Sequence, residues 1–271
     1  IWKGLVGSEM CIRDSVRGAE ISTKDGGLTT LETVARSSFN DFNYAFGIQL
    51  NNETLDIEYN DLARAEFDSD GKITKTADLF FLGGGQNVDE SRNKYGAFFE
   101  GEQEFFGSLG LRLAARYEKV DNFSSLDPKL SLRFNPIEEI TFRISRGTSF
   151  TMPSMAQMFS SDINLGSVRD LDDNIFVRQA RIGNPDLKPA TSTNSNFGFV
   201  YDSDVNRFSL DYWEIDYRNR IEAESSQALL DLDPQGPSIT RNENGELIAV
   251  TTTYFNDCLL YTSDAADDGL C

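Results

Sequence analysis

Apolar and polar residues alternate with a period of two along most of the chain, which indicates β-strands rather than helices. The clearest run covers residues 109–118, where Leu109, Leu111 and Leu113 share one face and small or charged residues occupy the other. The same alternation recurs at residues 43–50, 55–60, 94–106, 129–134, 140–145, 196–201 and 207–212, with further strands predicted at 247–255 and, weakly, at 28–35. The pattern therefore predicts an all-β protein whose sheet has one apolar face.

Short turns and long loops join the predicted strands in alternation. Short turns fall at residues 106–108, 135–138 and 202–206, and longer connections fall at 61–93, 152–189 and 221–245, with 121–127 the shortest of the long set. In a soluble β-sandwich, short and long connections are not expected to alternate in this way. The strands, at about 10–15 residues, also exceed the usual five or six of soluble sheets. Short turns at one rim and long loops at the other predict an antiparallel transmembrane β-barrel.

The polar faces of two neighbouring strands carry charges of opposite sign. Glu100, Glu102 and Glu104 share one face of their strand, and such a row of carboxylates cannot lie in hydrocarbon. We expect these glutamates to line a wet lumen, where Arg112 and Arg116 of the next strand pair with them across the sheet. Paired carboxylates such as Glu100 and Glu104 also serve glycosidases. Their spacing along one strand, beside arginines, favours the lumen.

The apolar faces distinguish a membrane barrel from a secreted soluble β-protein that binds or cleaves polysaccharide. In a barrel they form one exposed belt, whereas in a soluble protein they are buried against a second sheet. The deciding residues are Leu109, Leu111, Leu113, Leu130, Leu132, Phe142 and Ile144. One strand departs from the pattern, because its apolar residues switch face at Trp213. This switch predicts either a β-bulge or a strand that extends beyond the membrane.

Aromatic residues gather near the predicted strand ends. An interfacial girdle and ordinary packing within strands both explain this distribution. The residues are Tyr95, Tyr117, Phe123, Phe150, Phe159, Tyr201, Tyr212 and Trp213.

Composition narrows the classes of function. The 271 residues are 39% hydrophobic, with 20 Phe and 9 Tyr, which suits a folded domain and not a disordered chain. A net charge of -19 disfavours nucleic acid as a partner. The acidic residues fit solvated loops, and they would also suit cations or lipopolysaccharide bridged by divalent metal. The lack of histidine excludes a Ser-His-Asp triad within the chain. The sequence contains no run of 18 apolar residues, so it predicts no transmembrane helix.

An acidic cluster in the longest loop lacks the pattern of a metal site. Asp170, Asp172 and Asp173 lack the alternate oxygen ligands and the turn glycine of a calcium loop. We interpret the cluster as part of a solvated loop and predict neither a metal site nor a cofactor.

The two ends of the chain differ from the rest. Residues 5–15 (LVGSEMCIRDS) and 258–268 (CLLYTSDAADD) look like translations of a sequencing-library adapter in its two orientations. We therefore expect residues 1–15 and 258–271 to be artefacts, and residues 16–257 to be one partial barrel domain. The cysteines Cys11, Cys258 and Cys271 all lie in the excluded parts. A disulfide or metal set is the weaker interpretation, since their spacing fits no zinc pattern.

Two phrases that flank the longest loop resemble those of a known family. The sequence RISRGTSFTMPSMAQMF, followed by GNPDLKPATSTNSNFGF, is similar to the C-terminal barrel part of TonB-dependent outer-membrane receptors. In that family a strand ends in a phrase like GFRAPS, an extracellular loop follows, and GNPDLKPE leads into the next strand. Here Thr151 and Met152 replace the usual Arg and Ala, and Ala190 replaces the usual Glu, which leaves the fold assignment intact. The matching positions are Gly147, Phe150, Pro153, Ser154, Gly183, Asn184, Pro185, Asp186, Leu187, Lys188 and Pro189.

The resemblance implies a piece of a larger transporter in the bacterial outer membrane. It implies about eight or nine strands of a plugged barrel of about 22, without the plug and the TonB box. The expected function is active uptake of a scarce nutrient, such as a siderophore, cobalamin or an oligosaccharide, with no enzymatic activity. The expected partners are outer-membrane lipid and lipopolysaccharide, the ligand, and TonB through an N-terminal part that this stretch lacks. A passive porin is an alternative with the same architecture.

The residues of the two phrases also have a purely structural explanation. Pro185 and Pro189 stiffen the chain and push the residues before them to extended geometry, and Asn184 favours a turn. Pro153 ends the outgoing strand in the same way. We expect these residues to shape the loop, and the sequence identifies no residue that selects a ligand.

Overall fold

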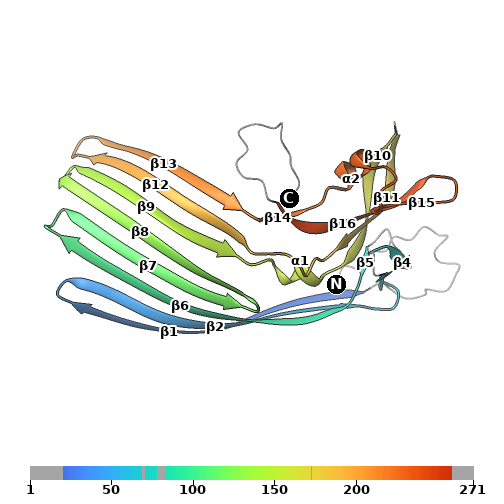
Figure 1. The fold of residues 1–271 in the computed structure, drawn as a ribbon, viewed down its shortest axis with the longest axis horizontal. Helices are drawn as coiled ribbons and strands as arrows, with labels where there is room; N and C mark the ends of the chain where they lie inside the picture. The colour runs from blue at the N-terminus through green and yellow to red at the C-terminus, as the bar shows by residue number, and fades with distance from the viewer. Residues whose placement is uncertain (1–20, 69–70, 78–82, 172, 258–271) are drawn as a thin grey trace.

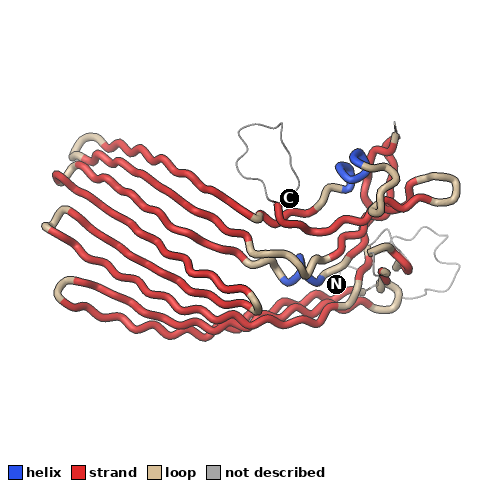
Figure 2. Tube along the Cα trace, viewed as in Figure 1, coloured by secondary structure: helices blue, strands red, loops and turns tan. Residues whose placement is uncertain are grey.

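The computed structural model of the chain describes residues 21–68, 71–77, 83–171 and 173–257, and almost all of them belong to β-strands or their turns (Figure 2). Within these ranges no helix is long and apolar enough to cross a membrane. The two segments expected to be adapter-derived, with all three cysteines, lie outside the described residues, as does Asp172.

Eight long strands form one antiparallel sheet in which every strand pairs with its neighbour along the wall (Figure 1). In spatial order they are β1 (Ser22–Phe39), β2 (Phe42–Tyr59), β6 (Val88–Phe105), β7 (Leu109–Val120), β8 (Phe123–Ile137), β9 (Ile140–Thr151), β12 (Ala190–Asp202) and β13 (Arg207–Arg218). The predicted fold class, a partial antiparallel barrel of about eight or nine strands, is confirmed. Among the described residues the sheet is open, with β1 and β13 at its edges.

One face of this sheet is a continuous apolar surface. Residues directly opposite each other on neighbouring strands share a face, and Leu111 lies opposite Leu132, which lies opposite Ile144. The row continues through Phe197 to Tyr212. We call this surface the apolar belt, and its members are Leu31, Tyr44, Phe46, Ile48, Leu50, Tyr95, Phe99, Leu109, Leu111, Leu113, Tyr117, Leu126, Leu130, Leu132, Phe134, Phe142, Ile144, Phe197, Phe199, Tyr201, Phe208, Leu210 and Tyr212.

The apolar belt is not covered by a second sheet. All seven residues chosen above to decide between barrel and soluble protein lie on it, and each is exposed or half-buried. Leu113 is 46% exposed and Ile144 is 50% exposed. The prediction of an exposed belt is therefore confirmed, and burial of these residues against a second sheet is ruled out for the described part of the chain. The opposite face, onto which the loops fold, is called the inner face below.

The apolar belt ends along one line that crosses the strands. Beyond that line the outward positions are polar, and the first of them are Asn52, Asn93, Lys119, Arg146, Ser195 and Glu214. Asn52 lies opposite Asn93, and its Nδ2 donates to Asn93 Oδ1 at 2.9 Å. Beyond the same line the inner faces of β2 and β13 become apolar, with Leu55, Ile57 and Tyr59 on β2 and Trp213, Ile215 and Tyr217 on β13. This inversion means that the strands continue past the belt into a region where loops supply the packing partner.

The face switch at Trp213 follows from this inversion. β13 pairs with β12 in unbroken register from Thr191 opposite Arg218 to Asp202 opposite Arg207. The proposed β-bulge is therefore wrong, and the proposed extension beyond the belt is right. Trp213 and Ile215 point to the inner face, and Glu214 and Asp216 take the outward positions.

Short connections lie at one rim of the sheet and long connections at the other, with one exception. Tight turns at residues 40–41, 106–108, 138–139 and 203–206 lie at one rim, and segments 60–87, 152–189 and 219–246 lie at the other (Figure 1). The loop predicted at 121–127 is instead a two-residue turn, because β8 begins at Phe123. Asp121 has a φ of 51°, which tight two-residue hairpin turns require. Ser125 and Asp127 were assigned to a loop because they are polar, but they are inner-face residues of the strand that bond each other at 2.8 Å.

Other strands are longer than their patterns predicted. β1 spans 18 residues where only 28–35 was predicted, and β6 begins at Val88 rather than at residue 94. The additional residues 88–93 of β6 and 22–27 of β1 lie beyond the apolar belt, where outward positions are no longer apolar. Residues 36–39 of β1 lie at the level of the belt, with Ser37 opposite Tyr44.

The long loops build a layer of their own at the looped rim. A six-stranded sheet runs in the order β14 (Arg220–Ala223), β16 (Leu247–Asp257), β11 (Asp173–Ile182), β10 (Asp162–Asp170) and β5 (Gly84–Gly85), with β15 (Ile239–Arg241) beside β16. The remaining elements are β3 (Glu66–Phe67), β4 (Ile73–Lys75), α1 (Met155–Phe159) and α2 (Ser226–Leu232). The strand predicted near 247–255 is thus present, but it pairs in parallel with β11 and not with the eight-stranded wall.

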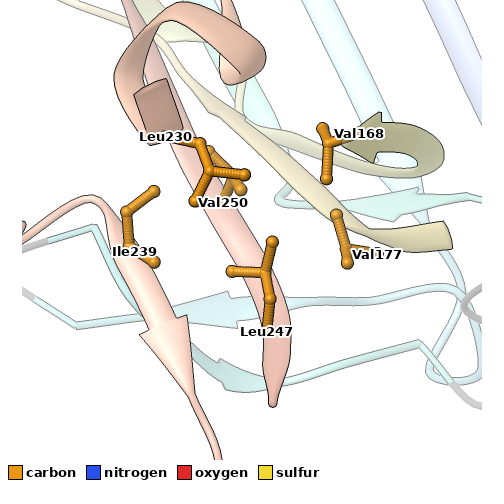
Figure 3. Packing of buried hydrophobic residues seen from close by; sticks show 6 residues of the cluster. All are labelled: Val168, Val177, Leu230, Ile239, Leu247 and Val250. Carbon is orange, nitrogen blue, oxygen red and sulfur yellow. The ribbon is translucent and has the colours of Figure 1, made fainter. Parts of the chain in front are cut away.

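The largest buried apolar cluster belongs to this rim layer, and a smaller one lies around Ile57 and Val88 where the wall strands enter it. Figure 3 shows Val168 and Val177 of the β10–β11 hairpin facing Leu230 of α2 and Ile239, Leu247 and Val250. Val250 is fully buried. Burial of these aliphatic side chains is what lets a hairpin stand at the rim as a folded element.

Candidate functional site at the looped rim and inner face

The inner face of the wall carries cross-strand ion pairs. Arg112 lies 2.9 Å from Glu100, Arg133 lies 3.4 Å from Glu104, and Arg143 lies 3.0 Å from Asp211. All of these residues except Glu100 line an open groove of about 570 Å³. The prediction that Arg112 pairs with a glutamate of the preceding strand is confirmed. Because each pair is partly exposed, it contributes little stability and gives the wall a charged, wettable surface.

Arg116 does not pair with the glutamates of the preceding strand. It contacts Glu118 of its own strand and donates from Nη2 to Gln49 Oε1 at 2.6 Å. The reason is register, since Arg116 lies directly opposite Phe98, while Arg112 lies opposite Glu102 and one rung from Glu100. Glu100 and Glu104, considered above as a glycosidase pair, are each held by an arginine.

The first motif phrase leads out of β9 into a short helix. Gly147 and Phe150 lie within β9, and Pro153 follows its end and is buried. Ser154 caps α1, because its hydroxyl accepts from the Gln157 N–H at 3.1 Å while Gln157 Oε1 accepts from the Ser154 N–H at 2.9 Å. This reciprocal arrangement fixes where α1 begins.

The second motif phrase returns against the same helix. The Cα of Gly183 lies so close to α1 that an added Cβ would stand 2.7 Å from the Met158 carbonyl oxygen. The Asn184 N–H donates to the Gln157 carbonyl at 2.9 Å, and its side chain accepts from the Asp186 N–H, also at 2.9 Å. Two residues that are distant in the sequence, Pro153 and Gly183, are therefore joined by α1.

The rest of the second phrase attaches to β16. Asn184 Nδ2 donates to the Tyr254 carbonyl at 2.8 Å, and Asn256 exchanges hydrogen bonds with the backbone N–H and C=O of Lys188 at 2.7 and 2.8 Å. Leu187 is fully buried. Pro185 and Pro189 flank this attachment and precede β12. Gly147 and Phe150 thus lie within β9, and the other nine motif residues lie where the loop leaves and rejoins the wall.

One residue at this junction was missed by the sequence reasoning. Arg92 of β6 is only 5% exposed, and its guanidinium reaches both the wall and the loop that carries α1. It lies in a polar run, SRNK, where no pattern distinguishes a buried arginine from a solvated one. Its burial comes from Pro153, which is 61 positions away in the sequence.

Two carboxyl groups of the rim sheet have shifted pKa values. Two hydrogen bonds from Arg241, at 2.7 and 2.9 Å, hold the pKa of Asp170 below its ordinary value. Burial raises the pKa of Asp162, against the opposing charges of Lys24 and Arg181. Asp170 belonged to the acidic cluster interpreted as a solvated loop, and that interpretation is wrong for this residue, because its side chain is paired and largely buried. Among the described residues, no group of three or more Cys, Asp or Glu side chains could hold a metal ion.

Comparison with known families identifies this architecture. Residues 13–256 match the family described as "TonB dependent receptor-like, beta-barrel". The chain belongs to this family. The resemblance inferred from the two motif phrases is therefore confirmed over nearly the whole described chain.

Solved structures agree with this assignment to the TonB-dependent receptor barrels. The chain is similar to a mutant of the ferric enterobactin receptor PfeA from Pseudomonas aeruginosa, crystallised with enterobactin, with a TM-score of 0.61 and 18% identity over 88% of this chain and 32% of that one. It is similar to the siderophore receptor PirA from Acinetobacter baumannii, with a TM-score of 0.59 and 18% identity over 88% and 33%. The hemophore receptor HasR of Serratia marcescens gives 0.55 and 12% over 88% and 38%.

These similarities show the fold of the chain. The chain spans about a third of the length of the structures it matches. A comparison with curated proteins finds no match.

Proposed function

We propose that the chain is part of a TonB-dependent receptor that imports a scarce nutrient across the bacterial outer membrane. The observation that supports this proposal best is the pairing of an exposed apolar belt with a charged inner face on the same eight strands. Lipid can cover the apolar belt, and water can solvate the charged inner face. A passage through the membrane needs both surfaces.

The rim layer supports the capture step. In this proposal the looped rim faces the cell exterior, so that β10, β11, β15 and α2 meet the ligand first. Siderophores, cobalamin and oligosaccharides are the candidate ligands, and the similar structures named above include receptors for siderophores and a hemophore. The partners would be outer-membrane lipid and lipopolysaccharide around the belt, and TonB through an N-terminal part outside this chain. The eleven motif residues would shape the rim without contacting ligand.

Energy coupling separates this proposal from a passive porin. The experiment is to produce the complete receptor in cells with and without TonB, and to measure accumulation of labelled ferric siderophores, cobalamin and oligosaccharides. We expect one class to accumulate above its external concentration, and only in cells that contain TonB. Equal entry of a small solute in both strains would establish a passive pore, and accumulation of none of the three classes would overturn the proposed substrates.

A further inference from the structure

Arg92 is the one charged residue among the described parts of the chain that is buried. It lies on the inner face of β6, directly opposite Glu53 of β2 and just beyond the edge of the apolar belt. Burying a guanidinium costs free energy unless its donors are satisfied. What satisfies Arg92 therefore indicates why a charge is kept at this place.

The guanidinium of Arg92 divides its donors between the wall and the loop. Its Nε and Nη2 atoms donate to Glu53 Oε2 at 3.1 and 2.6 Å, which makes a forked bond across the β2–β6 rung. Lys94 pairs with the other oxygen of Glu53. The Nη1 atom points away from this pair and donates to the Pro153 carbonyl at 2.9 Å, with the Met158 sulfur 3.9 Å away.

This contact connects Arg92 to both motif phrases. Pro153 immediately precedes the capped first turn of α1, and α1 in turn holds Gly183 and Asn184. Phe159 at the end of α1 packs on the apolar cluster around Ile57 and Val88 of the same two wall strands. The hydrophobic contact gives α1 a surface to rest on, and the directional bond from Arg92 sets its position on that surface.

We propose that Arg92 is a positioning residue that fixes α1, and with it both ends of the β10–β11 segment, over the inner face of the wall. Only an arginine serves here, because its planar fork binds one carboxylate oxygen with two N–H groups and still presents a third donor to a backbone carbonyl. The inference rests on the proposed function only where it assigns a use to the positioned loop, namely presentation of the rim to a ligand.

The test follows backbone hydrogen exchange in the complete receptor, purified in detergent micelles. The informative amides are those of Met158 and Ser160, which donate to Ser154 and Ala156 within α1. For Arg92→Gln we expect exchange in α1 to accelerate by about tenfold or more, with unchanged protection in the belt strands. Arg92→Lys should give an intermediate acceleration, because an ammonium group cannot form the fork. Arg112→Gln, which removes an exposed pair of the same wall, should leave α1 unchanged.

Two results would overturn the proposal. Unchanged exchange in α1 for Arg92→Gln would show that Phe159 and the contacts from Gly183 and Asn184 position the helix without Arg92. Acceleration spread evenly over belt strands and α1 would show that Arg92 serves general stability. If Arg92→Gln does not reach the membrane, the same comparison between α1 and the belt strands is made with Arg92→Lys. Exchange does not depend on transport, so the proposed uptake can fail while this inference stands.

Discussion

At the scale of single residues, Gly183 shows how closely the second motif phrase approaches α1. A Cβ at this position would stand 2.7 Å from the Met158 carbonyl oxygen and 2.8 Å from the Phe159 nitrogen, and backbone atoms of a capped helix cannot yield as a side chain does. We expect Gly183→Ala in the complete receptor to cost about 1–3 kcal/mol of unfolding free energy through overpacking. Gly26→Ala is the matched control, since nothing lies within 4 Å of its added Cβ. Urea unfolding of the two variants checks the difference, and equal stability would show that α1 and Gly183 are not in contact.

Two aspartates of the rim sheet should respond to pH in opposite directions. Arg241 lowers the pKa of Asp170, so the contribution of this pair is complete above the ordinary carboxyl pKa of about 4 and is lost as pH falls through the lower folded-state pKa. Burial raises the pKa of Asp162, so its contribution is complete below about 4 and declines as pH rises through the raised value.

The expected outcome at neutral pH follows from these signs. Asp170→Asn should destabilise the rim sheet by about 2 kcal/mol, because it replaces a charged acceptor of two guanidinium bonds. Asp162→Asn should be neutral or stabilising. Proteolysis of the segment 152–189 at pH 7, compared between the two variants, measures both effects. Faster cleavage of the Asp162 variant than of the Asp170 variant would contradict this assignment.

At the scale of elements, β7 offers neighbouring positions on opposite faces. Leu113 lies on the apolar belt, whereas Ala114 lies on the inner face opposite Glu100. In lipid vesicles Leu113→Arg should cost about 2–4 kcal/mol, as expected for an arginine that faces hydrocarbon. Ala114→Arg should cost much less, because the inner face is wet there and Glu100 lies opposite. The folded fraction of each variant, read from the mobility of unheated samples on gels, gives the comparison. Equal losses would mean that the belt does not face lipid.

The strands and loops also show which parts of the fold the sequence predicts and which it does not. The alternation over residues 109–118 of β7 predicted its faces correctly because this part of the strand lies within the belt. The prediction of a loop at Ser125 and Asp127 is wrong because these polar residues occupy inner-face positions of β8 on either side of Leu126. The β10–β11 hairpin was predicted as loop, since Val168 and Val177 find their partners only in α2, β15 and β16. Arg92 could not be found at all, because its burial depends on a carbonyl brought close by the fold.

At the scale of the whole molecule, the described sheet has two unpaired edges, at β1 and β13. Each long edge presents backbone N–H and C=O groups that pair readily with any other strand. The apolar belt adds exposed side chains across all eight strands, such as Phe46 at 51% exposure and Leu210 at 57%. In a complete barrel, further strands would cover the edges and lipid would cover the belt. Neither protection is available to this chain alone in water.

We therefore expect the 271-residue chain, produced by itself, to aggregate in aqueous buffer and to remain dispersed only in detergent. The net charge of -19 opposes aggregation, but it is screened over about 8 Å at physiological salt, whereas edge pairing and belt contact act at van der Waals distance. Light scattering across a detergent titration, repeated at low and high salt, separates these contributions. Scattering that falls only above the critical micelle concentration, at both salt levels, is the expected result. A soluble monomer that melts cooperatively without detergent would contradict this prediction, because it would mean that the chain itself covers the apolar belt.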